Sequence, residues 1–354
     1  MESRLELAAL LAEDLFRSPE VDSVYLGGSL TAGLGNATSD IDIFVLLSGE
    51  RPPADVAQLL EQGERLDVEY HTLAEARARV ERVLAARAGV GDLSGYWTGE
   101  SDLDFTVRLL NCRPVSRSPA FDALFRQVTD AAAHIRRLLL GVYSVYAQAV
   151  LEDLRGAWDD GDQEATAHLG QSALLYAAKG AAAAAGQCYL GTKWVFRQLR
   201  QGYGDQSPHR DLRFGAPDGT PLGEADVSAL TGRVQELLTQ SQLIGWHGPA
   251  DRWHRPTAGT GTLVRNPDFM PFRIPEGVLL SHERVRQLVV KPQVAAVWWL
   301  SHGLAPAEVA ATLPALAARL PEVAGMGPER VGSVVAALVR QGLLLESGEP
   351  GADA

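Results

Sequence analysis

The chain has 354 residues, too many for one small core, and its 46% hydrophobic and 21% charged content is that of an ordinary globular protein with two or three domains. Its net charge of −12 argues against a protein that coats nucleic-acid backbones, because such binding needs a basic surface. Two cysteines, no apolar run of about 18 residues and no signal-peptide core argue against a disulfide framework, a membrane span and secretion, so we expect a cytoplasmic protein.

The first 90 residues alternate between helical and extended patterns. Apolar residues at helical spacing predict an opening helix over residues 5–16. Short apolar or alternating runs predict three strands, at Val21–Gly27, Asp40–Leu47 and Arg65–Thr72. Pro52–Gln62 is helical in pattern, and Thr72 is a helix cap. The order α-β-α-β-α-β-α predicts an α/β (α+β) domain with a small mixed sheet over residues 1–115.

Long helical patterns follow this first domain. Phe121–Leu154 and Glu164–Gln201 have apolar residues at three- and four-residue spacing, which predicts a helical bundle over residues 116–202. Residues 203–274 are rich in Gly, Pro, Asp and Arg, and we expect a loop-rich connection with one helix at Glu224–Gln242.

Residues 275–347 predict a compact C-terminal domain with an initial strand, three helices and a short closing strand. The helices and the closing strand are expected at Lys291–His302, from Ala305 onwards, at Pro328–Gln341 and at Leu343–Leu345. Residues 348–354 read as a disordered tail.

These C-terminal pieces resemble a winged helix-turn-helix. More loosely, they resemble the small domains that deliver precursor peptides to enzymes modifying ribosomally made natural products. Residues 275–354 carry six basic and eight acidic side chains, a net charge of −2, which disfavours DNA as a partner. Peptide or protein recognition and a structural or dimerising role both stay open.

Two carboxylates are the most informative feature of the sequence. A strand-like run, Val24–Ser29, is followed by Asp40-Ile41-Asp42-Ile43. Asp40 and Asp42 lie two apart on the predicted strand, so their carboxylates project from one face about 6.6 Å apart along the chain. Such a pair repels unless a cation lies between its members. It can hold two magnesium ions for in-line displacement at phosphorus.

The turn before these acids has a composition suited to phosphate. Gly27 and Gly28 permit a tight strand-to-helix turn and a close backbone approach. The amides that follow, with the Ser29 hydroxyl, can then receive a phosphate at a helix start. A Gly-Gly-Ser turn alone is usually only a turn, and Asp-x-Asp alone is usually an exposed strand face. Their combination in this order is what predicts a site.

Gly28-Ser29, Ser39-Asp40-Ile41-Asp42 and a later acid on a third strand resemble the signature of the DNA-polymerase-β-like nucleotidyltransferase superfamily, over roughly residues 1–110. The resemblance implies that Asp40 and Asp42 bind magnesium. It also implies that the nucleotide triphosphate is held by Gly28 and Ser29, to which we add their neighbours Gly27 and Ser39.

The third acid of that signature has two candidates, Asp67 and Glu69. Asp67 fits the hydrophobic-acid-hydrophobic pattern best, while Glu69 lies two residues on and on the same face. Either can complete the metal site or remove the proton from the acceptor. An acid from the helical domain is a further candidate for that base.

The triphosphate carries about four negative charges, so a lysine near it is expected as well. Only three of the 32 basic residues are lysines. Lys193 resembles the lysine on the helix that follows the catalytic domain in aminoglycoside nucleotidyltransferases. Lys179, fourteen residues earlier, would share that face if the helix were continuous. Either lysine can instead be an ordinary solvated side chain.

We therefore expect a magnesium-dependent enzyme, with two metal ions, that transfers a nucleoside monophosphate from a nucleoside triphosphate, with ATP preferred, to an acceptor and releases pyrophosphate. The acceptor is a small molecule or a peptide. The alternatives are a catalytically silent nucleotide-binding regulator on the same fold, and a winged-helix transcription-associated protein with an N-terminal ligand domain. The complete set of acids argues against the silent regulator, and the acidic charge argues against the transcription-associated protein.

Overall fold

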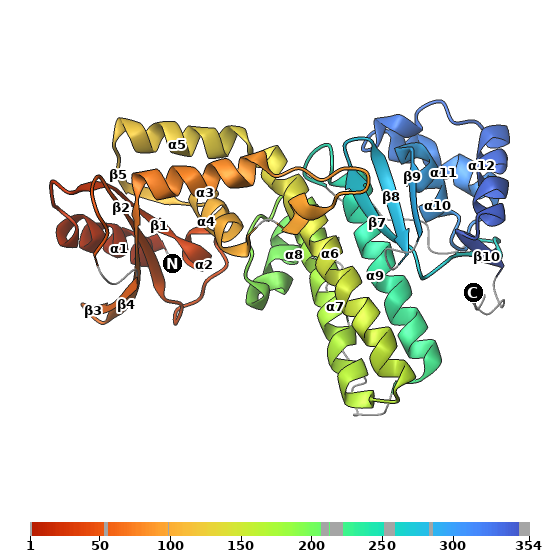
Figure 1. Ribbon diagram of the computed structural model, residues 1–354, viewed down its shortest axis with the longest axis horizontal. Coiled ribbons are helices and arrows are strands. Elements are labelled where there is room, and N and C mark those ends of the chain that lie inside the picture. The colour runs from red at the N-terminus through yellow and green to blue at the C-terminus, as the bar shows by residue number, and fades with distance from the viewer. Residues whose placement is uncertain are drawn as a thin grey trace. The chain divides into compact units, whose positions relative to one another are not determined.

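The computed structural model describes residues 2–52, 56–97, 99–206, 212, 222–250, 259–282 and 286–346 (Figure 1). The chain forms two compact units. Unit 1 contains Met1–Arg87, Trp97–Ile135 and Cys188–Gln198. Unit 2 contains Ala88–Tyr96, Arg136–Gln187 and Leu199–Ala354. The expected tail at residues 348–354, and parts of the expected connection at 203–274, lie outside the described residues.

The elements of unit 1 are those of a sheet covered by helices. They are α1 (Glu2–Leu15), β1 (Val21–Gly27), α2 (Gly28–Thr31), β2 (Ile41–Leu47), β3 (Val56–Glu61), β4 (Glu64–Thr72), α3 (Leu73–Ala85), α4 (Glu100–Leu110), β5 (Arg113–Ser116), α5 (Pro119–Asp130) and the 3₁₀ turn η2 (Thr192–Trp194). The strands form a sheet of order β3-β4-β2-β1-β5. Because β2 and β4 are parallel and the other pairs antiparallel, the mixed sheet expected from the sequence is confirmed.

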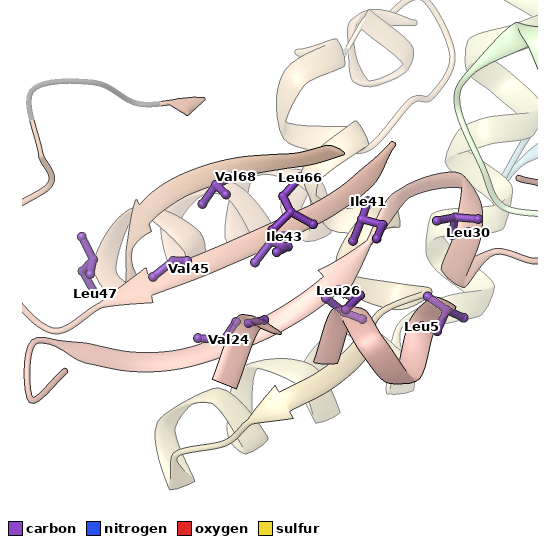
Figure 2. Packing of buried hydrophobic residues seen from close by; sticks show 12 residues of the cluster. Leu5, Val24, Leu26, Leu30, Ile41, Ile43, Val45, Leu47, Leu66 and Val68 are labelled. Carbon is purple, nitrogen blue, oxygen red and sulfur yellow. The ribbon is translucent and has the colours of Figure 1, made fainter. Parts of the chain in front are cut away.

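One face of this sheet packs against α1. Alternate strand residues such as Ile41, Ile43 and Val45 belong to a buried cluster that includes Leu5 of α1 (Figure 2). Since side chains alternate across a strand, Asp42 and Phe44 project to the opposite face. There the Tyr25 and Phe44 rings stack with centroids 4.8 Å apart.

The helix expected at Pro52–Gln62 is wrong, because its described part is strand β3. This strand pairs antiparallel with β4 through a two-residue turn, with Glu61 opposite Glu64. The turn residues Gln62 and Gly63 have φ of 51° and 82°, the left-handed conformation of a hairpin turn. Pairing with β4, the other strand of this hairpin, overrides the local helical pattern of the segment.

Unit 2 contains three long helices, a C-terminal set of shorter ones and two small sheets. Its elements are the 3₁₀ turn η1 (Ser94–Trp97), α6 (Ala132–Asp159), α7 (Gln163–Ala184), α8 (Val195–Tyr203), η3 (Gly204–Gln206), α9 (Glu224–Ile244), β6 (Leu263–Arg265), β7 (Met270–Ile274), β8 (Gly277–His282), β9 (Arg286–Val290), α10 (Pro292–Leu300), α11 (Pro306–Ala317), η5 (Pro321–Val323), α12 (Pro328–Arg340) and β10 (Leu344–Glu346). η1, α6 and α8 each continue into unit 1.

The three C-terminal helices and the closing strand β10 agree with the expectation from sequence. The part before them differs, because the antiparallel strands β7, β8 and β9 form a sheet where one strand was expected. This arrangement does not confirm a winged helix. No helix in the described part of the chain is both long and apolar enough to cross a membrane.

Candidate active site

The strand register brings the glycine turn and two acids into one row. Gly27 of β1 lies opposite Asp42 of β2, and Asp42 lies beside Asp67 of the parallel strand β4. Neighbouring strands are about 4.8 Å apart, so this row is compact. Glu69 lies on the same face as Asp67, one pleat further along the strand.

Gly28 permits the close approach that defines the turn. Its φ is +75°, and a Cβ placed there would lie 1.8 Å from Asp42 Oδ2. The Asp42 carboxylate therefore rests directly on the backbone of the turn. Helix α2 is a single turn, and the loop folds back on it because Leu34 N and Gly35 N each donate to Ser29 O at 2.8 Å.

Ser39 contributes mainly to the shape of the loop before β2. Its Oγ accepts a hydrogen bond from Asn36 N at 2.9 Å and lies 3.2 Å from Asn36 Oδ1. Arg4 of α1 donates to the carbonyl oxygens of both Asn36 and Ser39. These bonds hold the loop that delivers Asp40 to the start of the strand.

Two arginines contact Asp40, which precedes β2, and Asp42 within it. Arg65 Nη2 lies 2.7 Å from Asp40 Oδ1, and Arg108 Nη1 lies 3.0 Å from Asp42 Oδ1. Arg108 also approaches Glu69 Oε1 at 3.8 Å and is held by Asp104, one helical turn earlier, at 2.6 Å. The Asp104–Arg108 spacing on a helix predicts an ion pair, but nothing local in the sequence indicates that the guanidinium also reaches Asp42.

The charges around Asp42 shift its proton affinity. Burial raises the pKa of Asp42, and the neighbouring carboxylates of Asp67 and Glu69 raise it further, against the lowering effect of Arg108. Burial would also raise the pKa of Glu69, but the hydrogen bond with His71 and the charge of Arg108 outweigh it and lower that pKa. Negative charge at Asp42 is therefore only partly compensated, and a further cation would stabilise it.

The donor chemistry suits magnesium, which prefers carboxylate oxygens. Asp40, Asp42 and Asp67 supply such oxygens at neighbouring positions. Even so, no three His, Cys, Asp or Glu side chains of the described residues come together closely enough to hold a metal ion in this structure. Instead, Arg65 and Arg108 contact two of these acids.

A segment far along the chain packs next to the loop of the turn. Asn111 Nδ2 donates to Cys188 O at 2.6 Å, and Arg197 Nη1 donates to the carbonyl oxygens of Leu34 and Gly35. The Arg197 guanidinium lies 4.7 Å from the Trp194 ring centroid. Between these anchors, Lys193 is exposed, with its Nζ 5.3 Å from the same ring.

Tyr189 of this segment also lies near the acids. Burial raises the pKa of its phenol, Arg108 opposes the rise, and Asp42 and Asp104 add to it. No pattern in the sequence singled out Tyr189, Trp194 or Arg197, because their role depends on a contact between distant parts of the chain.

The continuous helix that would have placed both lysines on one face is not present among the residues that the structure describes. Helix α7 ends at Ala184, and Lys193 belongs to the separate turn η2. Lys179 lies in unit 2, its side chain is 1% exposed and its Nζ is 5.4 Å from the Tyr143 ring centroid. Such an enclosed ammonium group has no surface on which to receive a triphosphate.

Residues 10–87 match the family model described as the nucleotidyltransferase domain. This segment is therefore similar to nucleotidyltransferase domains. It contains the glycine turn and all four acids, whereas Arg108 and Lys193 lie outside it. A nucleotidyltransferase-like protein from Exiguobacterium sibiricum 255-15 is structurally similar, with 12% identity, a TM-score of 0.40 and coverage of 69% of this chain and 77% of that one. A search of the curated proteins found no match.

Arg108 is expected to stabilise unit 1 mainly when Asp42 is ionised. Replacing Arg108 with methionine should lower the free energy of unfolding by about 2–3 kcal/mol at pH 7, because it leaves partly buried carboxylates without their cation. Asp42, whose pKa burial already raises, would then have a still higher pKa. The folded state would bind the proton more tightly than the unfolded state, so the loss should shrink as the pH falls toward 4.

Urea unfolding at pH 7 and pH 4.5 measures this difference. Arg65→Met is the matched control, because the Arg65 side chain is 66% exposed and its pair with Asp40 should contribute below about 1 kcal/mol. A loss for Arg108→Met that is the same at both pH values would contradict the assigned pairing with Asp42.

Proposed function

We propose that this chain is a magnesium-dependent nucleotidyltransferase that transfers a nucleoside monophosphate from a nucleoside triphosphate, ATP by preference, to a small-molecule or peptide acceptor. The observation that carries the proposal is the row of Gly27, Asp42 and Asp67 across three strands, with the Asp42 carboxylate against the Gly28 backbone. The reaction needs a backbone turn that can receive a triphosphate close to carboxylates that can bind a metal, and the row supports the proposal because it brings a glycine turn and two carboxylates together.

In the proposed mechanism the turn at Gly28 and Ser29 seats the triphosphate tail, with Gly27 and Ser39 shaping the turn and the loop after it. Asp40 and Asp42 would hold two magnesium ions, with Asp67 as a further ligand. When bound, magnesium would supply positive charge to offset that of the triphosphate and the departing pyrophosphate. Asp67 accepts the proton of the acceptor group that attacks the α-phosphorus, and Lys193 adds positive charge for the phosphates.

Incubation of the full chain with magnesium, each nucleoside triphosphate labelled at the α-phosphate and several acceptor pools tests the proposal. We expect pyrophosphate release and transfer of label with at least one triphosphate, and neither with Asp40→Asn. Equal pyrophosphate release by the wild type and this variant in every pool would show that the proposal is wrong.

The third carboxylate is tested by a pair of conservative variants. Asp67 lies beside Asp42 in the parallel register, whereas Glu69 is already held by His71, 3.5 Å away, and by Arg108. Asp67→Asn should therefore lower kcat by about 10²-fold or more, and Glu69→Gln by less than about 10-fold. Single-turnover kinetics at saturating magnesium measure both. A larger effect of Glu69→Gln would assign the third carboxylate to Glu69 instead.

A catalytically silent nucleotide-binding regulator is the second candidate. The contacts of Arg65 with Asp40 and of Arg108 with Asp42 favour it, because these guanidinium groups compensate the acids that a metal would otherwise neutralise. A silent regulator would bind a nucleoside triphosphate with the same affinity in magnesium and in EDTA, and would release no pyrophosphate. The proposed enzyme needs the divalent cation for both.

In this proposal the C-terminal helices α10, α11 and α12 form a winged-helix-like or peptide-binding-like element that holds the acceptor. The net charge of −2 over residues 275–354 supports a peptide or small molecule over DNA.

A further inference from the structure

Unit 2 contains a pocket that the proposed reaction does not use. It has a volume of about 220 Å³ and lies between α6, the first turns of α9 and the residues 267–270 that lead into β7. Leu151 and Leu154 of α6 and Met270 of β7 are buried and form apolar wall, and Trp158 of α6 adds an aromatic side chain. The pocket is smaller than the roughly 300–1,000 Å³ typical of drug-sized ligands, so it suits a small one.

The charged groups of the pocket are mostly acidic. Glu152, Glu224 and Asp268 line it together with Arg155, so three carboxylates and one guanidinium leave two negative charges. Arg155 Nη2 pairs with Asp268 Oδ1 at 2.8 Å, which fastens the residues before β7 to α6. Within the described chain, Glu152 and Glu224 form no ion pair with a basic side chain, and Glu152 accepts a hydrogen bond from Gln148 Nε2 at 2.8 Å.

We propose that this pocket binds a small molecule with a protonated amine and an apolar, aromatic body. The apolar walls would take the body out of water, while Glu152 and Glu224 face the ammonium group with uncompensated charge. Trp158 adds a ring face that attracts a cation. The same two carboxylates would repel an anion, so the pocket is unsuited to a nucleotide or pyrophosphate. This inference holds whether or not the chain transfers nucleotides.

Three probes with the same phenylethyl body separate charge from shape: phenethylamine, the neutral 2-phenylethanol and the slightly larger, anionic 3-phenylpropionate. Calorimetric titration into the full chain at pH 7 should show phenethylamine binding at least about 10-fold more tightly than 2-phenylethanol, with 3-phenylpropionate weakest. Absence of phenethylamine binding up to 10 mM, or equal affinities for the amine and the alcohol, would overturn the proposal.

Two carboxylate variants assign the binding to this pocket. Glu224→Gln should weaken phenethylamine about 3- to 10-fold and leave 2-phenylethanol unchanged. Glu164→Gln is the matched control, because Glu164 is likewise an exposed acid in the first turn of a helix, here α7, and does not line the pocket. Equal effects of the two variants would overturn the assignment.

A blocking variant gives a second readout that does not depend on charge. Ser228 and Ala229 are adjacent exposed residues of α9, and only Ser228 is among the residues that line the pocket. Ser228→Phe should abolish binding of both phenethylamine and 2-phenylethanol, and Ala229→Phe should change neither. Unchanged binding by Ser228→Phe would place the amine elsewhere and contradict the proposal.

Discussion

Replacing Asp42 with asparagine is expected to lower nucleotidyl transfer by at least about 10²- to 10³-fold. Asp42 is the central member of the row, in contact with the Gly28 backbone, Arg108 and the neighbouring Asp67. An amide in its place keeps the shape but removes the negative charge that would hold a divalent cation. Pyrophosphate release at saturating triphosphate measures the loss, with the exposed Asp14→Asn of α1 as a control that should be fully active.

The same variant should not be destabilised at neutral pH. Burial raises the pKa of Asp42 in the folded protein, so its ionisation lowers the free energy of unfolding as the pH rises from about 4 through the raised pKa. Asparagine removes this penalty, and the melting temperature of Asp42→Asn should match or exceed that of the wild type at pH 7. The difference should disappear below about pH 4, where aspartate is protonated in both states. An inactive variant that melts well below the wild type at pH 7 would instead show a folding defect.

Replacing Gly28 with alanine is expected to remove activity and stability together. The new methyl group would overlap Asp42 Oδ2, and alanine is disfavoured at a φ of +75°. The turn must move away from the acid, so we expect a loss of about 10²-fold or more in transfer and of about 1–3 kcal/mol in the free energy of unfolding.

Gly63→Ala is the matched control for that substitution. Gly63 has a similar φ of +82°, but a Cβ there would meet nothing within 4 Å. In urea unfolding, Gly63→Ala should lower the free energy of unfolding by about 1 kcal/mol, because alanine is disfavoured at this positive φ. It should retain full transfer activity. If both variants lose the same small amount of stability and both stay active, the close approach between Gly28 and Asp42 has no functional role.

Much of unit 1 was predictable because its strands carry local signals. The run Val21–Gly27 and the alternation in Arg65–Thr72 mark β1 and β4, and Thr72 with Glu75 forms the capping box that begins α3. The faces were predictable too, since a strand with period two separates Ile41 and Ile43 from Asp42.

What the sequence could not predict depends on pairing and contacts that lie outside the local residue pattern. Strand β3 exists because it pairs with β4, although its own residues have a helical pattern. The approach of Arg108 to Asp42 joins helix α4 to strand β2 across 66 positions. Similarly, whether one helix runs from Lys179 to Lys193 was left open by the sequence, and in the structure α7 ends at Ala184, where the chain turns at Ala185 and Gly186.

The segment Cys188–Gln198 belongs to unit 1 but is synthesised only after residues 136–187 of unit 2. The loop at Leu34 and Gly35 is made early, yet the Arg197 that binds its carbonyl oxygens follows the excursion of residues 136–187. At synthesis rates of about 5–20 residues per second, Arg197 leaves the ribosome roughly 3 to 12 s after Ile135. During that interval the residues of the sheet and the acids have been synthesised, but Arg197, which donates to the carbonyl oxygens of the turn's loop, has not. A truncated chain ending near residue 135 would lack these contacts altogether.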